Sequence, residues 1–341
     1  MTNFAQQVVK RLEDLGVKRI YGLVGDSLNP LSDAVRQSDI EWVHVRNEEA
    51  AAFAAGADSL AADELAVCGA SCGPGNTHFV QGLFESHRNG SKVLAIASHI
   101  PTVEIGSSFF QETHPELLFQ ECSSYCEVVH NADQGMRILH NALQNTLAGN
   151  GVSVMVVPGD VFAEDTADGP HTSDSVYATG ANKRVYPDPH EAARLVEAIN
   201  KADKVTLFCG YGARDAREEV FALAEKIKSP IGHSFRGKMY FEYDNPYDVG
   251  MSGLLGYGAC LDAMDESDLF IMVGTDFPYS DWLPDENVAQ IDIDGSHIGR
   301  RTKVDYPVVG DVKSVIENIL PHIEENKDRK FLDKMLKRHY Q

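Results

Sequence analysis

The sequence has few cysteines, and their spacing excludes two common kinds of site. Six cysteines occur among 341 residues, at positions 68, 72, 122, 126, 209 and 260, and no CxxC pair is formed. Zinc fingers and disulfide-rich scaffolds therefore do not fit this chain, and we expect buried, reduced thiols. None of the thirteen histidines stands in an HExxH pair. We predict that the chain alone binds no metal.

Positive charge is also scarce. The 51 acidic residues outnumber the 30 basic ones, which gives a net charge of -21 at pH 7. A surface this negative repels phosphate backbones and anionic lipid headgroups, which argues against binding to nucleic acid or to membranes through basic patches. The sequence has no apolar run of the roughly 20 residues that cross a bilayer. It also shows no secretion signal at its start, so we expect a cytoplasmic protein.

The chain does contain a repeated alternation of strand and helix patterns. Its length suits two domains, and near-continuous apolar strands between amphipathic helices are typical of parallel sheets covered on both faces. We therefore predict an α/β fold with two doubly wound parallel-sheet domains. The predicted parts are a first domain at 1–162, a linker at 163–188, a second domain at 189–325 and a terminal segment at 326–341. The terminal segment carries one apolar stripe, which is more typical of a linker helix or a packing surface than of a membrane anchor, and we expect it to be the start of a linker.

Apolar periodicity predicts the individual elements. Helices are expected at 4–15, 30–36, 48–60, 77–87, 112–120, 136–147, 190–202, 213–227 and 312–320. Strands are expected at 19–23, 42–45, 65–70, 93–97, 152–157, 205–209, 230–233, 269–273 and 288–293.

Three segments of the first domain stand at the carboxyl ends of expected strands, where such sheets bind ligands. Glu48 and Glu49 could be catalytic, or could form an acidic first turn that complements the helix dipole. Residues 71–76 are rich in glycine and could bring backbone amides close to a ligand, or form only a turn. Residues 109–112 combine aromatic and polar side chains, and could equally be a hydrophobic staple before a helix.

The second domain has comparable segments. Residues 251–256 are punctuated by glycine, residues 275–279 follow an expected strand, and Asp292 lies near the end of another. An acidic side chain at that place can accept hydrogen bonds from ribose hydroxyls. Residues 210–212 add an isolated GxG, which is weak evidence alone. Each segment could be a plain loop, but their joint placement at strand ends favours a nucleotide site.

With these segments in view, the sequence resembles the thiamine-diphosphate-dependent pyruvate oxidase family, and within it the pyruvate:quinone oxidoreductases most of all. The resemblance runs along the whole chain and depends on the joint match of separate segments. They are residues 17–28, 48–56, 71–76, 99–101, 110–115, 243–251 and 274–279.

This resemblance implies a first domain that holds the aminopyrimidine of thiamine diphosphate and a Rossmann-like second domain that binds FAD. Glu48 matches the family glutamate that hydrogen-bonds the pyrimidine ring, and Phe110 and Gln111 match residues that face the substrate. A carboxyl group in an apolar pocket can carry the proton that this role requires. The implied reaction converts pyruvate to acetate and carbon dioxide, with electrons passed through FAD to quinone.

We expect cofactor-binding residues in both domains. They are Gly25, Asp26, Gly73, Pro74 and Asn76 in the first, and Ser252, Gly253, Leu254, Leu255, Thr275, Asp276, Phe277, Pro278, Tyr279 and Asp292 in the second.

The sequence departs from the family in two respects. Many relatives have histidine where this chain has Asn47, which puts a proton-relay role for that position in question. The family also has a third domain that binds the diphosphate and Mg²⁺ through a Gly-Asp-Gly…Asn signature, and no such signature occurs in the 341 residues. We therefore expect this chain by itself not to decarboxylate pyruvate, even when thiamine diphosphate, Mg²⁺ and FAD are supplied.

The resemblance also implies partners. The family assembles as dimers of dimers, so we expect self-association of this chain. In the quinone-dependent types a C-terminal tail makes peripheral membrane contact, and the matching tail is not found here. Two other interpretations stay open: a flavin-binding, self-associating module without turnover, and another FAD-containing member of the family such as acetolactate synthase.

Overall fold

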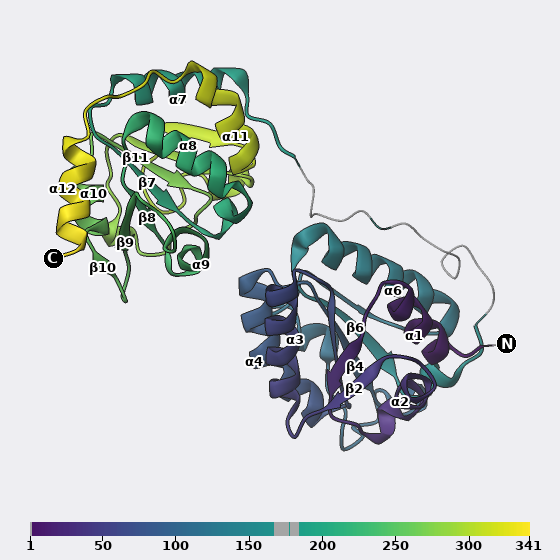
Figure 1. Ribbon diagram of the computed structural model, residues 1–341. Helices are drawn as coiled ribbons and strands as arrows, with labels where there is room; N and C mark the ends of the chain where they lie inside the picture. The colour runs from purple at the N-terminus through teal and green to yellow at the C-terminus, as the bar shows by residue number, and fades with distance from the viewer. Residues whose placement is uncertain (1, 167–176, 178–183) are drawn as a thin grey trace. The chain divides into compact units, whose positions relative to one another are not determined.

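The computed structural model describes residues 2–166, 177 and 184–341. The chain forms two compact units, Met1–Lys183 and Arg184–Gln341 (Figure 1). Most of the linker predicted at 163–188 lies outside the described residues.

The first unit is built on a six-stranded sheet in which all neighbouring strands run parallel, in the order β2-β1-β3-β4-β6-β5. Its strands are β1 (Arg19–Gly22), β2 (Glu41–His44), β3 (Ala66–Ala70), β4 (Val93–His99), β5 (Tyr125–Val128) and β6 (Ser153–Pro158). Its helices are α1 (Phe4–Asp14), α2 (Asn29–Arg36), α3 (Glu48–Ala62), α4 (Pro74–Asn89), α5 (Pro115–Leu118) and α6 (Ala132–Asn145).

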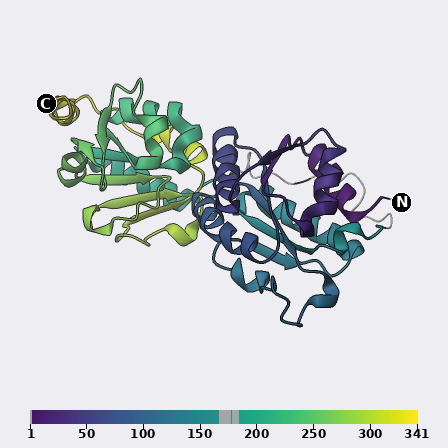
Figure 2. The ribbon, with the colours of Figure 1, turned by 90° about the horizontal axis from the view of Figure 1, so that it is seen from below.

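Helices cover both faces of this sheet. Successive strand residues point to opposite faces, so Val67 packs with α1, α2 and α6 while its neighbour Cys68 packs with α3 and α4. Helices α3 and α4 lie side by side in both views (Figures 1 and 2). Their contact is close because small residues face each other: a Cβ added at Gly82 of α4 would lie 2.6 Å from the Cβ of Ala52. This pairing places the start of α3 beside α4.

The second unit holds a seven-stranded sheet in the order β10-β9-β8-β7-β11-β12-β13, parallel except for the pair β9 and β10. Its strands are β7 (Val205–Cys209), β8 (Ile231–His233), β9 (Asp248–Met251), β10 (Tyr257–Gly258), β11 (Leu269–Val273), β12 (Val288–Asp292) and β13 (Tyr306–Val309). Its helices are α7 (Pro189–Lys201), α8 (Arg217–Ile227), α9 (Lys238–Phe241), α10 (Cys260–Asp265), α11 (Val312–Ile319) and α12 (Lys330–His339).

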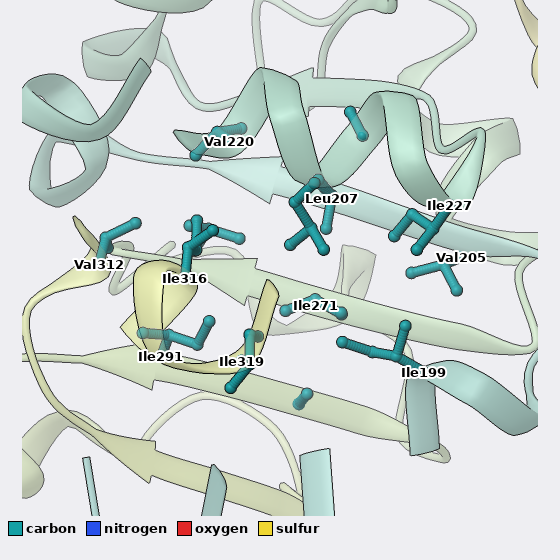
Figure 3. Close-up of a cluster of buried hydrophobic side chains, with 14 of the residues drawn as sticks. Ile199, Val205, Leu207, Val220, Ile227, Ile271, Ile291, Val312, Ile316 and Ile319 are labelled. Atoms are coloured by element: carbon teal, nitrogen blue, oxygen red, sulfur yellow. The ribbon is translucent and has the colours of Figure 1, made fainter. Parts of the chain in front are cut away.

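The larger core of this unit lies under α7, α8 and α11. Figure 3 shows Leu207, Ile271 and Ile291, from three neighbouring strands, facing Val220 of α8 and Ile316 of α11. All five side chains are at most 1% exposed. Burial of such aliphatic side chains contributes about 1.5–3 kcal/mol each, so this layer holds the strand ends in fixed positions.

The terminal apolar stripe is a packing surface, which is one of the two roles expected for it. Leu332 and Met335 of α12 are fully buried, and Arg338 forms an ion pair of 2.6 Å with Asp262 of α10. Among the residues that the structure describes, no helix combines the length and apolar character needed to cross a bilayer.

The predicted fold class is confirmed, whereas several element predictions were wrong. The helix expected at 112–120 is only the single turn α5, because Pro115 keeps His114 out of helical conformation (φ -110°, ψ 78°). Helix α4 begins at Pro74 rather than at residue 77, since proline is tolerated in the first turn. The helix expected at 213–227 begins at Arg217, after a 3₁₀ segment at Tyr211–Ala216.

Four strands were missed, β5, β9, β10 and β13, and they lie at or next to the sheet edges. Each has four residues or fewer, and β13 includes Pro307, which only an edge strand tolerates easily. Short edge strands lack the apolar runs by which the central strands were predicted.

Candidate active site

In the first sheet, β2 is added on one side of β1, whereas β3 and the later strands are added on the other side. The order of the strands therefore reverses between β1 and β3. In doubly wound sheets, ligands bind beside such a reversal, at the carboxyl ends of the two strands. The loops that follow β1 and β3 approach each other there, since a Cβ added at Gly25 would lie 2.3 Å from Ser71 Oγ. Any side chain at position 25 would separate the loops, which explains the glycine.

Three serines join these loops. Ser27 Oγ lies 3.0 Å from Ser71 Oγ and 2.6 Å from Ser98 Oγ. Ser27 Oγ also accepts the backbone N–H of Cys72 at 3.1 Å, and Ser98 Oγ donates to the carbonyl of Ala70 at 3.0 Å. The network fixes the loops relative to the sheet. Sequence reasoning missed it because single serines on three separate segments form no motif.

Three residues that were predicted to bind a cofactor have structural roles within the protein itself. Asp26 Oδ1 accepts the backbone N–H of Ser27 at 2.8 Å, and Pro74 is the first residue of α4. Asn76 is fully buried, and its Nδ2 donates to the carbonyl of Ser98 at 2.8 Å. Its Oδ1 has no hydrogen-bond partner among the described residues. Direct contact of these side chains with a cofactor stays a prediction.

Glu48 is the first residue of α3 and is only 5% exposed. Asn47 is the N-cap of this helix, and its Oδ1 accepts the backbone N–H of Glu49 at 2.8 Å. Asparagine is a preferred N-cap residue, so the structure gives Asn47 a role in starting the helix that presents Glu48.

The two carboxylate oxygens of Glu48 have different surroundings. Oε2 lies 2.9 Å from Nδ1 of His78 on α4. Oε1 has no hydrogen-bond partner among the described residues, and a Cβ added at Gly75 would lie 3.0 Å from it. A side chain at position 75 would therefore occupy the space beside Oε1. Sequence reasoning missed His78, although its spacing of three residues from Gly75 puts both on one face of the helix.

The predicted substrate-facing loop reaches the same region. A Cβ added at Gly73 would lie 2.9 Å from Cβ of Gln111, so the loop packs against the start of α4. Phe110 is 83% exposed and contacts Phe109, with ring centroids 4.6 Å apart. The structure thus brings Gly73 and Gln111 together and leaves the Phe110 ring largely in solvent.

The second sheet reverses its winding between β7 and β11. Backbone bonds join the ends of these strands: Gly210 N–H donates to the carbonyl of Val273 at 3.0 Å, and Gly212 N–H to that of Gly274 at 2.9 Å. A Cβ added at Gly210 would lie 2.4 Å from Cβ of Thr275. The two glycines of the isolated GxG therefore allow the backbone segments after β7 and β11 to approach each other closely.

Asp276, predicted to bind a cofactor, is held by two arginines. Its Oδ1 and Oδ2 accept Nε and Nη2 of Arg301, each at 3.0 Å, and Oδ2 accepts Nη1 of Arg300 at 3.2 Å. Such a bidentate pair is strong and directional. The Asp276 carboxylate therefore anchors the loop that carries these arginines.

Asp292 ends β12 and is 6% exposed. Burial raises the pKa of its carboxyl group, while the N–H of Asp294 at 3.0 Å and nearby His297, at 3.3 Å, act in the opposite direction. These three residues gather closely, yet no group of three or more His, Cys, Asp or Glu in the described part of the chain is arranged to hold a metal ion.

The glycine-punctuated loop between β9 and β10 contacts the segment that follows β11. A Cβ added at Gly253 would lie 3.5 Å from the Tyr279 ring and 3.6 Å from Phe277. Leu254 and Leu255 beside it are 73% and 69% exposed. Phe277 is buried, whereas Pro278 and Tyr279 are exposed. The loop and the aromatic segment form one partly apolar surface. Ser252 and Thr275, which were also predicted to bind a cofactor, are both buried.

Each of the two units matches a domain of one known protein family. Residues 2–119 match the thiamine pyrophosphate enzyme N-terminal TPP binding domain, and residues 192–319 match the central domain of the same enzymes. The chain belongs to the thiamine pyrophosphate enzyme family. The Glu48 region thus lies in a TPP binding domain, and the second reversal lies in the family's central domain.

Several relatives align along nearly the whole chain. An uncharacterized 42.6 kDa protein of Pseudomonas amyloderamosa is 46% identical over 342 residues, covering 98% of this chain and 85% of that protein. A pyruvate oxidase of Lactiplantibacillus plantarum is 28% identical over 325 residues, covering 93% of this chain and 54% of the enzyme. A probable acetolactate synthase large subunit of Methanocaldococcus jannaschii is 30% identical over 335 residues, covering 93% and 55%. The chain spans about half the length of these two enzymes.

Proposed function

We propose that this chain takes part in the oxidative decarboxylation of pyruvate to acetate and carbon dioxide, with thiamine diphosphate and FAD as cofactors and quinone as electron acceptor. The observation that carries the proposal is Glu48, a buried carboxylate at the reversal of the first sheet. The alignment with a pyruvate oxidase along 93% of the chain supports the choice of substrate.

The surroundings of Glu48 fit an aminopyrimidine ring. Oε1 lacks a partner among the described residues and has glycine rather than a side chain beside it, so a ring nitrogen can take a hydrogen bond there. Thiamine diphosphate, when bound, would supply the thiazolium chemistry that activates the keto carbon of pyruvate for loss of carbon dioxide. Glu48 holds the proton at Oε1, and His78 fixes the carboxyl group through Oε2. Gln111 lies on the loop that packs against Gly73, where it can contact the substrate.

The second unit fits a flavin nucleotide. Asp292 offers a carboxylate to ribose hydroxyls at the end of β12, and the surface of Leu254, Leu255 and Tyr279 suits a planar apolar ring. FAD, when bound, would supply the two-electron acceptor, with quinone as the final acceptor. Mg²⁺ belongs to the diphosphate of thiamine, and we assign it no ligand among these residues.

Acetolactate synthase is the second candidate. A relative of that name aligns at 30% identity, slightly above the pyruvate oxidase. The same Glu48 and Gln111 would serve it, because both reactions begin with pyruvate decarboxylation. The fate of the two electrons separates the candidates.

The test first measures cofactor binding and then identifies the reaction products. The purified chain should bind FAD, seen as flavin absorbance, and thiamine through Glu48. When the family's third domain is joined to the chain and both cofactors are bound, anaerobic pyruvate should bleach the flavin and yield acetate. Acetolactate with an unbleached flavin would favour the synthase, and a chain that takes up neither flavin nor thiamine would contradict both candidates.

A further inference from the structure

A buried carboxylate lies between two histidines that come from different elements of the second unit. Asp248 is the first residue of β9 and is 5% exposed. Its Oδ1 lies 3.6 Å from Nε2 of His233, at the end of β8, and its Oδ2 lies 3.5 Å from Nε2 of His339. His339 is the last residue of α12. One carboxyl group therefore faces both a core histidine and the end of a surface helix.

A neutral His233 ring cannot donate a hydrogen bond to this carboxylate. Its Nδ1 lies 3.2 Å from the carbonyl of Ser234, and because a carbonyl only accepts, Nδ1 carries the hydrogen. Nε2 then has a lone pair and no hydrogen, and it has no hydrogen-bond partner among the described residues. One added proton, on Nε2 or on the Asp248 carboxyl group, turns this contact into a hydrogen bond. His233 and Asp248 are thus arranged to take up a proton together.

The other titratable groups near the two histidines are paired or neutral. Lys238 of α9 and Glu242, which follows that helix, form an ion pair, and Lys238 Nζ also lies 2.8 Å from the hydroxyl of Tyr257 in β10. Burial raises the pKa of the Cys260 thiol in α10, which keeps this thiol neutral. The Asp248 carboxylate balances one positive charge, so a second charged imidazole beside it would be uncompensated in a buried place.

The last turn of α12 depends on His339 for its seat on the sheet. The apolar anchors of the helix, Leu332 and Met335, lie in its earlier turns. Arg338 in the last turn pairs with Asp262, but these side chains are 50% and 33% exposed, and such surface pairs contribute only about 0–1 kcal/mol. The His339 side chain is 13% exposed. Its ring lies directly on the backbone of β10, since a Cβ added at Gly258 would lie 2.3 Å from Nδ1.

Docking of this turn and proton uptake oppose each other. Burial lowers the pKa of His233 and raises that of Asp248, and the neighbouring His339 lowers the pKa of both groups. Departure of His339 therefore raises the proton affinity of the pair. By linkage, a proton bound to the pair favours the departure of His339 to the same extent.

We propose that α12 is a pH-sensitive strap. At neutral pH the Asp248 carboxylate holds His339 on the sheet, and in mildly acidic solution a proton taken up by His233 and Asp248 releases the last turn of the helix. Because α12 packs on β9 and β10, its release uncovers the end of the sheet that β10 forms. The proposal concerns the second unit alone and does not depend on the cofactors of the proposed function.

Hydrogen–deuterium exchange of the full chain at pH 7.5 and 5.5, read by mass spectrometry, tests the strap. The rates are corrected for the chemical dependence of amide exchange on pH. His339→Phe removes the imidazole nitrogens and keeps an aromatic ring, and Asp248→Asn imitates the protonated carboxyl group. Arg338→Gln is the matched control, because it removes a charged contact of the same turn and leaves both histidines in place.

In the wild type, the amides of residues 336–341 should exchange at least about tenfold faster at pH 5.5 than at pH 7.5, while those of β7 and β11 stay protected, because only the strap opens. His339→Phe and Asp248→Asn should already exchange fast in this segment at pH 7.5 and change little with pH. Arg338→Gln should keep the pH dependence of the wild type.

Three results would overturn the proposal. The first is equal or slower exchange of residues 336–341 at pH 5.5 in the wild type. The second is a rise of exchange in α12, β7 and β11 together, because the whole unit then unfolds and no strap opens. The third is a wild-type pH dependence in His339→Phe, which would mean that another contact holds the helix. If Asp248→Asn does not fold, His339→Phe decides alone, since its ring lies at the surface end of the cluster.

Discussion

Nδ1 of His78 on α4 lies 2.9 Å from Oε2 of Glu48 on α3. The carboxylate is 7% exposed at its side chain, whereas the imidazole is 51% exposed. The histidine therefore lies between the buried Glu48 carboxyl group and the solvent-exposed side of the site. Because the contact occupies Oε2, it sets the orientation of the carboxyl group and leaves Oε1 for a ligand.

This contact makes His78 a positioning residue. We expect His78→Ala to lower the affinity for thiamine by about three- to tenfold, the worth of one hydrogen bond, because the Glu48 carboxyl group becomes free to rotate. Ligand-observed NMR titration measures the change. Gln81→Ala is the control, since Gln81 is an exposed residue on the same helix. Equal affinities of His78→Ala and wild type would show that Glu48 holds its orientation without the histidine.

Asp292→Ala should weaken FAD binding by about 1–3 kcal/mol, because the carboxylate accepts ribose hydroxyls in the proposed site. Fluorescence titration with FAD checks this. Asp294→Asn serves as control, since Asp294 is half-exposed and its side chain is engaged with the backbone of Ser296. Unchanged affinity in Asp292→Ala would move the ribose elsewhere.

Asp276→Asn should lower the free energy of unfolding of the second unit by about 1–2 kcal/mol, because a neutral amide at position 276 cannot form the bidentate ion pair with Arg301. The side chains are 23% and 32% exposed, so the pair is partly shielded from solvent. Urea unfolding measures the effect. Asp281→Asn, an exposed carboxylate nearby, should stay within about 0.5 kcal/mol of wild type. The account of Asp276 as a loop anchor is wrong if both variants unfold alike.

His233 makes the stability depend on pH. Burial lowers the pKa of this fully buried imidazole, with Asp248, Lys238, Glu242 and His339 around it. A lowered pKa keeps the ring neutral in the fold, so the unfolded chain binds more protons below about pH 6.5. The contribution of the neutral His233 ring to the free energy of unfolding is therefore complete above that pH and is lost as the pH falls.

The test compares urea unfolding at pH 7.5 and 5.5. Wild type should lose stability between these values, and His233→Gln should lose less, whatever its absolute stability. His190→Gln is the control, because His190 lies exposed on α7. Burial also raises the pKa of the Asp248 carboxyl group, which is present in both proteins. An identical pH dependence in wild type and His233→Gln would contradict the account.

Central parts of the fold were predictable because their residues form strong local patterns. The strand Leu269–Val273 was predicted to the residue, since a run of five apolar residues between Asp268 and Gly274 is typical of a buried parallel strand. The edge strand β13 was missed because Pro307 and its short length hide the pattern. Tertiary pairing, not local preference, forms that strand.

The site was predictable only in part, for a similar reason. Glu48 follows a strand and begins a helix, which is a local signal, and the family resemblance marked it further. The contact with His78 joins residues thirty positions apart and depends on the packing of α3 against α4. The contacts of Asp248 with His233 and His339 likewise join three different elements. Such side-chain pairs have no signature in the sequence.

The central claim is that the first unit binds the aminopyrimidine of thiamine through Glu48. Thiamine without diphosphate carries that ring and lacks the phosphates, so its titration into the purified chain tests the claim most directly. Wild type and Glu49→Gln should bind thiamine with equal affinity, while Glu48→Gln should lower the affinity at least about tenfold, because the amide cannot supply the proton to the ring. Equal affinity in all three proteins, or no binding to the wild type, would contradict the account.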